Sequence, residues 1–207
     1  MDIRHWFKRT DVLDSEINED NEEIEEKGKV NFDYIGKDIK WEEIDIFTDG
    51  STTNNGKKNA YGGLGVYFGK NDERNISKKV INSNKSVTNN ICELLAIKLG
   101  IEKILETTSK ENLKTTTIII YSDSEYCINC ITKWSKNWEK NGWKSSNGKP
   151  VKNKELIKYN YDYYNRYRIK FNHVRSHTKA PTEASKYKLW YGNEMADKLA
   201  KNASVSK

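Results

Sequence analysis

The chain has 207 residues, of which 32% are charged and 35% hydrophobic, and its mean hydropathy is −0.92. No apolar run approaches the roughly 18 residues of a membrane span, and no secretory signal is visible at the N-terminus. These features argue against a membrane-embedded or secreted protein and predict a soluble one. The length suffices for one packed domain of about 150 residues with an appendage.

Charge divides the chain into two parts. Residues 1–40 hold 12 acids and 7 bases, and because the whole chain is +6, the remainder carries +11. We interpret residues 1–40 as a flexible acidic extension, either a solvated tail or a competitor of nucleic acid for a basic groove. The basic remainder indicates a polyanionic partner, although solvated lysines alone would give a milder excess.

The first ten residues carry a short apolar motif. Ile3, Trp6 and Phe7 have the spacing of one helical turn, which could place them together in a partner's pocket. The motif resembles those by which some replication proteins bind sliding clamps, although its usual leading glutamine is absent. It predicts clamp binding and a link to DNA replication, with an ordinary frayed terminus as the alternative.

After the acidic extension the pattern becomes that of a folded domain. Three strands are expected over residues 43–51, 61–69 and 73–83, where apolar residues alternate or cluster between turn residues. Thr88 is the expected N-cap of a helix over residues 89–106, whose apolar residues recur at helical spacing.

The second half alternates strands and helices. Residues 115–124 have the composition of a buried parallel strand. The remaining elements are expected as a helix over 124–134, a helix over 152–164, a strand over 168–174 and a helix over 192–204. Three meandering strands followed by βαβ units predict an α/β fold with a mixed sheet flanked by helices. This catalytic domain would span residues 41–203, with a tail at 204–207.

Four carboxylates occupy four separate elements. Asp49 and Asp123 end apolar strands, and Glu93 and Asp197 lie on expected helices. An Asp at a strand end is more often a turn cap, but four acids brought together would repel one another unless cations held them. Because carboxylates are preferred ligands of Mg²⁺ and Mn²⁺, the set predicts a metal site.

The cysteines carry a weaker signal. Cys127 and Cys130 form a lone CxxC on an expected helix, with no second pair and no histidine at ligand spacing. Buried free thiols are expected, with zinc or redox use as the alternative. Unpaired cysteines favour an intracellular, reducing compartment, either the cytoplasm or the nucleus.

Six motifs occur in one order: FTDGS, TNNICEL, SDSEY, ITKWSKNWEKNGWK, KPVKN, and HVRSH followed by GNEMAD. In this order and spacing, residues 41–203 resemble ribonuclease H of type 1, which cuts the RNA of RNA–DNA hybrids. The resemblance implies a five-stranded mixed sheet whose first three strands are antiparallel. We expect the protein to be a monomer.

The resemblance also implies a mechanism with two Mg²⁺ ions, or Mn²⁺, about 4 Å apart. Hydrolysis by water would leave a 5′-phosphate and a 3′-hydroxyl without a covalent intermediate. His177 takes the position of a mobile histidine that relays a proton or assists product release. His173 is interpreted as structural. The metal-ligand positions fall on Asp49, Glu93, Asp123 and Asp197.

Other positions match contacts with the two strands of a hybrid. Asparagines can donate to and accept from a 2′-hydroxyl, while lysines of a basic protrusion bind backbone phosphates. Helix capping by Asn89 and Asn90, and core packing of Trp134 and Trp138, are the alternatives. The matched positions are Asn55, Asn89 and Asn90 for RNA, Thr88 and Asn137 for a DNA phosphate, and Trp134, Trp138, Lys140, Trp143 and Lys144 in the protrusion.

The chain departs from the family pattern in three places. Ser176 and Thr178 replace glycines that usually flank the mobile histidine, and Ser86 replaces an arginine of the phosphate pocket. Residues 178–191 form an expected loop longer than that of compact bacterial members. These departures bear on loop dynamics and on the strength of the phosphate pocket.

The residues therefore predict an Mg²⁺-dependent endoribonuclease specific for RNA–DNA hybrids. One rival is a non-catalytic nucleic-acid-binding module, which would be expected to have lost a carboxylate. Another is a DNA-cutting nuclease or transposase of the same fold, which would be expected to lack the TNN motif and the tryptophan–lysine protrusion.

Overall fold

The computed structural model describes residues 42–57, 59–81, 86–176 and 178–205. The predictions for residues 1–40, including the motif of Ile3, Trp6 and Phe7, lie outside this part. The described chain opens with three strands: β1 (Glu42–Thr53), β2 (Tyr61–Tyr67) and β3 (Ile76–Ile81). β1 pairs with β2, and β2 with β3, both antiparallel, which confirms the predicted meander.

Two later strands complete the sheet on the other side of β1. β4 (Thr116–Ser122) pairs in parallel with β1, and β5 (Ile169–His173) pairs in parallel with β4. The strand order is β3-β2-β1-β4-β5, so the predicted five-stranded mixed sheet is confirmed. Every residue of β4 is buried, as a central parallel strand covered on both faces requires.

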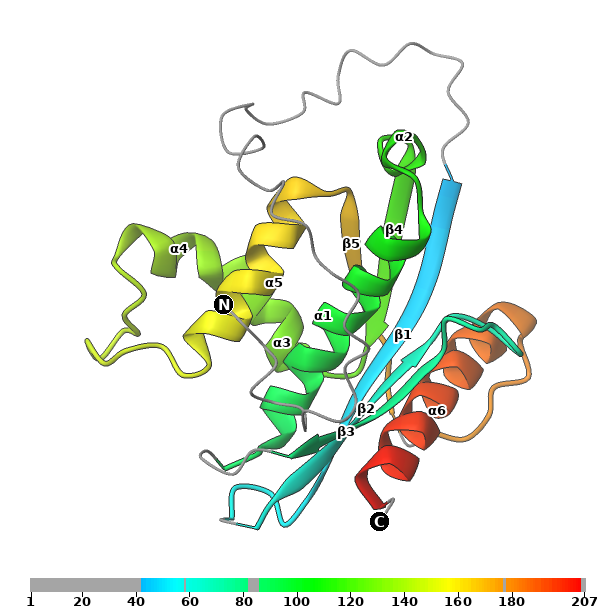
Figure 1. Ribbon diagram of the computed structural model, residues 1–207, viewed down its shortest axis with the longest axis horizontal. Coiled ribbons are helices and arrows are strands. Elements are labelled where there is room, and N and C mark those ends of the chain that lie inside the picture. The colour runs from blue at the N-terminus through cyan, green and yellow to red at the C-terminus, as the bar shows by residue number, and fades with distance from the viewer. Residues whose placement is uncertain (1–41, 58, 82–85, 177, 206–207) are drawn as a thin grey trace.

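One face of the sheet is covered by α1 (Asn89–Thr107), with α5 (Lys154–Arg166) packed beside it (Figure 1). The predicted cap is confirmed, because the Thr88 hydroxyl accepts a 3.4 Å hydrogen bond from the Ile91 N–H. Asn160 of α5 donates to the carbonyl oxygen of Leu94 at 3.0 Å, which ties the two helices together.

The core beneath α1 is aliphatic and closed to solvent. The sheet contributes Ile46, Leu64, Ile118 and Ile120, and α1 contributes Leu94, Ile97 and Ile101; all are at most 1% exposed. Burying each such side chain contributes about 1.5–3 kcal/mol relative to leaving it exposed. This face therefore holds most of the hydrophobic stabilisation of the fold.

The opposite face is covered by α6 (Ala184–Val205), as Figure 1 shows. Small residues let α6 lie close to the sheet. A Cβ on Gly65 of β2 would overlap the carbonyl oxygen of Ala196, so only glycine allows this approach. The cluster on this face is largely aromatic: Phe47 and Tyr121 stack at 4.7 Å between ring centroids, and Tyr67 lies beside Phe47.

The beginning of α6 differs from the prediction. The helix starts at Ala184 rather than at residue 192, so much of the expected loop over 178–191 is helical. Aromatic contacts support these added turns: the ring of Tyr187 lies 5.5 Å from Trp190 and 6.0 Å from Tyr191. The helix also continues through Val205, two residues past the predicted domain end at 203.

The segment after β4 also differs from the single helix predicted. It consists of α3 (Glu125–Asn129), a π-helical turn η5 (Cys130–Trp134) and α4 (Ser135–Lys140). The Ser135 hydroxyl donates to the Cys130 carbonyl at 2.6 Å within the widened turn. A short helix, α2 (Lys110–Leu113), was not predicted. Within the described ranges, no helix is both long and apolar enough to cross a membrane.

Candidate active site

Asp49 and Asp123 lie side by side because of the register of β1 and β4. The parallel pairing of these strands ends at Phe47↔Tyr121, and each aspartate follows two residues later. The prediction that Asp49 ends its strand is wrong, since β1 continues to Thr53 in pairing with the glycine-rich β2. Only its pairing with β4 stops before Asp49, and this places both carboxylates at the same edge.

Glu93 reaches this edge from the second turn of α1. A Cβ on Gly50 would overlap the Glu93 backbone nitrogen, so the glycine beside Asp49 is what lets α1 approach β1. One carboxylate oxygen each from Asp49, Glu93 and Asp123 all lie within 4.8 Å of one another. Two strands and one helix thus bring three acids to one point.

Asp197 joins the other acids from α6, on the opposite face of the sheet. It lines a hollow of about 390 Å³ together with Asp49, Glu93 and Asp123, and we call this the acidic hollow. Its Oδ2 accepts a 2.7 Å hydrogen bond from the ammonium group of Lys201, one helical turn later. The four predicted carboxylates therefore meet, although Asp197 lies outside the closest group of three.

Burial and repulsion from neighbouring carboxylates make Asp49 and Glu93 hard to ionise. Burial, followed by the charges of Asp123 and Asp197, raises the pKa of Asp49 from 3.8 to about 7. Burial, then Asp49 and Asp123, raises the pKa of Glu93 well above 4.5. In addition, Glu93 Oε2 has no hydrogen-bond partner among the described residues. Clustered oxygen donors with this unmet need for positive charge fit divalent cations such as Mg²⁺.

A second hollow adjoins the first and has a volume of about 280 Å³. The Asn55 side-chain oxygen accepts the backbone N–H of Asn89 at 3.1 Å. The Asn89 amide nitrogen in turn donates to Glu93 Oε1 at 3.4 Å, which connects the two hollows. We call this one the asparagine hollow; its lining residues are Asn55, Thr88, Asn89, Asn90, Tyr126, Lys152 and Asn153.

Several residues of the two hollows received no role from the sequence. Tyr126 ends the SDSEY motif, and Lys152 and Asn153 end the KPVKN motif, to which the sequence assigned no function. Asn153 immediately precedes the first residue of α5, and its backbone is left-handed, with φ 56°. Lys201 could have been found from its i,i+4 spacing to Asp197.

The tryptophans of the protrusion, residues 131–149, differ in exposure. Trp143 is only 7% exposed and belongs to the main core, whereas Trp134 is 39% exposed. Trp138 lies between them, with its ring 5.7 Å from Trp134 and 6.4 Å from Trp143. Trp143 therefore supports the protrusion from inside, and Trp134 offers most surface to a ligand.

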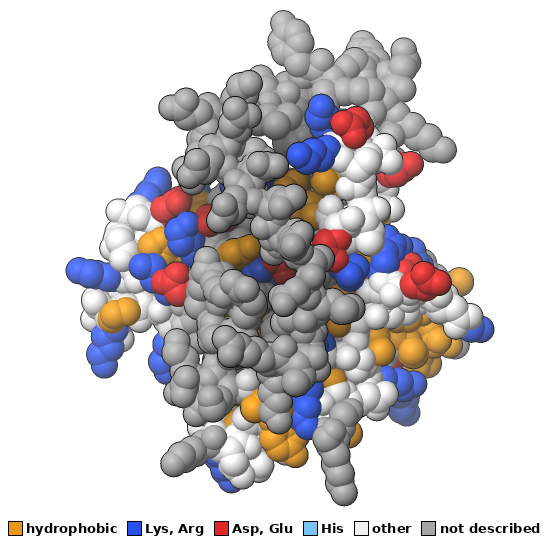
Figure 2. Space-filling model, in the orientation of Figure 1, with side chains coloured by type: hydrophobic (Ala, Val, Ile, Leu, Met, Phe, Trp, Pro, Cys, Tyr) orange, Lys and Arg blue, Asp and Glu red, His pale blue; other side chains and the backbone are white. Residues whose placement is uncertain are grey.

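The polar residues predicted for the protrusion are on its surface. Asn137, Lys140 and Lys144 are exposed, and Figure 2 shows Lys and Arg side chains gathered on the side where Figure 1 places α4. Asn137 does not line the hollow that contains Thr88. Exposed lysines here are available to a polyanion.

The remaining predicted residues have mixed outcomes. Cys127 and Cys130 are buried and free, as predicted, and burial raises the pKa of Cys130 to about 11. A third free thiol, Cys92, is also buried, and its pKa is raised to about 12. His173 lies 3.3 Å from the carbonyl oxygen of Asp123 and so contacts the backbone of the site. His177 lies outside the described residues.

Comparison with known families agrees with this geometry. The sequence profile of the RNase H family matches residues 42–205. The chain belongs to the ribonuclease H family. A ribonuclease H from Schizosaccharomyces pombe is 38% identical over 159 residues, which are 77% of this chain and 52% of the relative. The family and the names of its relatives place the chain among the ribonuclease H enzymes.

Other relatives differ in how much of their length is matched. A ribonuclease H from Clostridium botulinum is 35% identical across 76% of this chain and 93% of its own length. The ribonuclease H1 of Mus musculus is 30% identical across 90% of the chain, but only 57% of its own length is covered. The chain thus spans about half of the two eukaryotic relatives and nearly all of the bacterial one.

Solved structures show the same fold. LC9-RNase H1, a type 1 RNase H with the type 2 active-site motif, aligns with a TM-score of 0.56 over 81% of this chain and 74% of its own, at 21% identity. The foamy viral protease–reverse transcriptase in complex with an RNA/DNA hybrid aligns with a TM-score of 0.59 over 84% and 22% of the two chains, at 21% identity. These likenesses support the ribonuclease H fold.

Proposed function

We propose that the protein is an endoribonuclease that hydrolyses the RNA strand of RNA–DNA hybrids by two-metal-ion catalysis. The products would carry 5′-phosphate and 3′-hydroxyl ends. The observation that supports this most is the acidic hollow, where Asp49, Glu93 and Asp123 offer oxygens within 4.8 Å of one another and Asp197 stands beside them. Its family membership supplies the activity to which this chemistry belongs.

The four carboxylates would hold the ions, with Mg²⁺ the expected metal and Mn²⁺ an alternative. Such ions ionise water at neutral pH and stabilise charge on the departing oxygen. The protein's own part is to keep the carboxylates in position before substrate arrives. Gly50 and the register of β1 and β4 do this for Asp49, Glu93 and Asp123, and α6 does it for Asp197.

The asparagine hollow would select RNA on one strand. The Asn89 backbone N–H donates a hydrogen bond to the Asn55 side-chain oxygen, and the Asn89 side-chain amide donates to Glu93. An amide held in this way can bond a 2′-hydroxyl, the group that distinguishes RNA from DNA, directly beside the metal ligands. Asn90 lines the same hollow. This contact would couple recognition of RNA to catalysis.

The DNA strand would lie toward the protrusion. Trp134 offers an exposed ring and Lys140 and Lys144 offer exposed ammonium groups, while Thr88 and Asn137 are the proposed phosphate contacts. Phosphate binding by lysines would weaken as salt rises. His177 is proposed to move a proton or to assist product release, a role that suits an imidazole near neutral pH.

Cleavage of end-labelled duplexes tests the proposal. We expect the RNA of an RNA–DNA hybrid to be cut with Mg²⁺ and to remain intact with a chelator. Double-stranded RNA and double-stranded DNA should both survive. Cutting of double-stranded DNA would favour the DNA-nuclease alternative, and binding of hybrid without cleavage would favour the non-catalytic module.

A further proposal concerns the first ten residues. We propose that Ile3, Trp6 and Phe7 bind a sliding clamp, on the basis of their spacing and chemistry alone. Deleting residues 1–10 should remove binding to a clamp on a sensor surface without changing turnover of short hybrids. If the deletion variant bound the clamp as well as the full chain, this motif would have no such role.

We also propose that the protein is a monomer in a reducing compartment, the cytoplasm or the nucleus. The three buried free thiols support the compartment, because none of them forms a disulfide. Light scattering behind a sizing column would measure the mass against the 24.1 kDa of one chain. Imaging of a tagged protein would locate it in the cell.

A further inference from the structure

The first two turns of α6 display aromatic rings on the protein surface. Tyr187 is 45% exposed and is one of three large hydrophobic side chains that are exposed among the described residues. Its ring is nearly parallel to that of Tyr191, at 16° and 6.0 Å, and lies 5.5 Å from Trp190. An exposed ring held by two neighbours loses little conformational entropy when a planar ligand stacks on it.

Lysines surround these rings. Lys186 and Lys188 are each 69% exposed, and their ammonium groups lie 2.6 Å from Glu183 and 2.7 Å from Asp45. Surface ion pairs of this kind contribute little to stability, so phosphates can exchange for the carboxylates without much loss. Aromatic faces interleaved with lysines are the combination by which proteins bind single-stranded nucleic acid.

The arrangement of α6 connects these rings to the active site. Trp190 precedes Asp197 by seven residues and Lys186 precedes it by eleven, which are two and three helical turns. All three therefore lie on one face of the helix. At 1.5 Å per residue, Trp190 and Lys186 are about 10 and about 16 Å from Asp197 along the axis. A strand leaving the acidic hollow along this face would reach Trp190, whose ring lies 5.5 Å from that of Tyr187. Tyr187 itself lies about 80° around the helix from Asp197.

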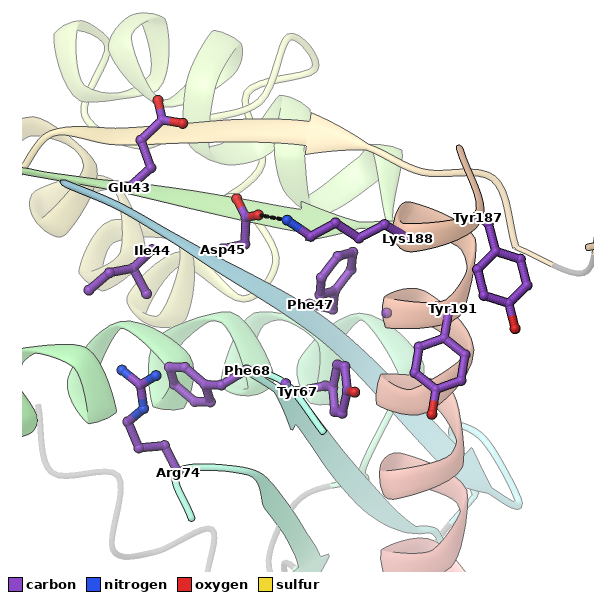
Figure 3. A pocket seen from close by; sticks show the side chains of 12 residues that line it. Glu43, Ile44, Asp45, Phe47, Tyr67, Phe68, Arg74, Tyr187, Lys188 and Tyr191 are labelled. Atoms are coloured by element: carbon purple, nitrogen blue, oxygen red, sulfur yellow. Dashed lines mark hydrogen bonds and ion pairs between the residues drawn. The ribbon is translucent and has the colours of Figure 1, made fainter. Parts of the chain in front are cut away.

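A pocket beside Tyr187 could receive one base. It has a volume of about 520 Å³ and lies between the start of β1 and the start of α6 (Figure 3). Phe47, Tyr67 and Tyr191 supply apolar walls, and Asp45 of β1 lines the pocket with its carboxylate paired to the ammonium group of Lys188. Carboxylates accept hydrogen bonds from the amino groups of bases. An aromatic pocket with one or two polar groups of this size suits a planar heterocycle.

We propose that Tyr187, Trp190 and Lys186, with the pocket beside them, bind single-stranded nucleic acid that continues from the end of the hybrid being cut. The protein would therefore prefer hybrids that carry an unpaired extension over blunt hybrids. This inference rests on the proposed cleavage of hybrids, because it extends the same substrate beyond the acidic hollow. An apolar peptide is the competing occupant, but Lys186, on the same face of α6 as Asp197, favours a polyanion that reaches the active site.

Steady-state kinetics on short hybrids test the inference. A blunt hybrid is compared with four versions that carry a ten-nucleotide extension of RNA or DNA at a 5′ or a 3′ end. Because stacking one base on an aromatic ring strengthens binding severalfold or more, we expect at least one extension to lower KM about tenfold. The version that does so identifies the strand and the polarity.

Substitutions test whether the lower KM of extended hybrids depends on the proposed residues. In Tyr187→Ser and Trp190→Leu, the ratio of KM for blunt and extended hybrids should fall from about ten to below two. Val205→Ser is the matched control, because Val205 is an apolar residue 69% exposed near the other end of α6. Its ratio should equal that of the unaltered protein.

Two results would overturn the inference. One is an equal KM for blunt and extended hybrids in the unaltered protein. This result is expected if the pocket binds a peptide instead of nucleic acid. The other is an advantage that persists in both Tyr187→Ser and Trp190→Leu. Neither result would affect the proposed function, which is tested separately by cleavage of the blunt hybrid.

Discussion

The two faces of the sheet are packed by different kinds of residues. Beneath α1 the contacts are aliphatic and fully buried, as Ile46 and Ile97 illustrate. Beneath α6 they are aromatic or very small, and the pocket beside Tyr187 remains open. The α1 face supplies most of the hydrophobic stabilisation. The α6 face is packed less completely, but it lets α6 lie close to the sheet and leaves side chains accessible to a ligand. The active site forms where helices from the two faces reach the same sheet edge.

Alternation along β1 is the origin of this difference. Ile46 points to the aliphatic cluster and Phe47 to the aromatic one, since successive side chains of a strand point to opposite faces. Gly50 and Gly65 then provide the close approaches of α1 and α6. As a result Glu93 arrives from one face and Asp197 from the other, with Asp49 and Asp123 between them.

The largest expected effect concerns the edge where both faces meet. Asp123→Asn should lower hybrid cleavage at least about 1,000-fold, or roughly 4 kcal/mol of activation free energy, because it removes a metal-ligand charge. Hybrid binding, measured by filter retention, should change little. Asp162→Asn alters an exposed carboxylate on α5 and serves as the control. Normal cleavage by Asp123→Asn would refute the metal assignment.

Cavity-forming substitutions on the two faces should lower the free energy of unfolding by different amounts. Ile97→Ala opens space in the closed α1 core and should lower the free energy of unfolding by about 3 kcal/mol. Leu199→Ala, on the partly buried α6 side, should lower it by only about 1 kcal/mol, because less of this side chain is buried. Urea denaturation measures both. Equal losses would contradict the division of roles between the faces.

Glycine substitutions should show which helix tolerates displacement. Gly65→Ala places a methyl group against the backbone of α6 and should cost about 2 kcal/mol and reduce cleavage, since Asp197 would move. Gly100→Ala meets mainly the flexible end of Ile46 and gains helix propensity. It should change stability by less than about 1 kcal/mol. If Gly100→Ala were the more damaging, α1 would be the less adaptable helix.

Acidity should change the stability of the metal-free protein. Burial and neighbouring carboxylates raise the pKa of Asp49 from 3.8 to about 7, so between these values the folded state binds more protons than the unfolded state. The metal-free protein should therefore lose stability as pH rises across this window. Asp49→Asn should flatten the dependence in thermal denaturation with chelator present. Mg²⁺ should raise Tm more at pH 8 than at pH 5, because protons compete with the metal.

Much of this organisation could be predicted before the structure. The β4 strand and the capped helix α1 were predicted nearly to the residue, because a run such as TTTIIIY and a Thr before a periodic helix are strong local signals. The meeting of the acids was expected from their charge and from the family resemblance. Four carboxylates on four elements have few reasons to meet other than a cation.

Features that depend on contacts between distant residues were missed. The first turns of α6 are held to β1 by the 2.7 Å ion pair between Lys188 and Asp45, and the end of the β1–β4 pairing depends on register rather than on composition. The position of Tyr126 and Lys152 beside each other in the asparagine hollow could not be predicted from the sequence. Local periodicity carries no information about such juxtapositions.

Residue type and order alone are enough to predict the acids, asparagines and lysines of this protein and the α/β pattern that carries them. The burial of Trp143 inside the protrusion, the exposure of Trp134, and the meeting of Asp197 with acids from the other face of the sheet follow only from packing of the whole chain. The reason is that residue type follows local chemistry, whereas burial and adjacency follow from how the whole chain packs.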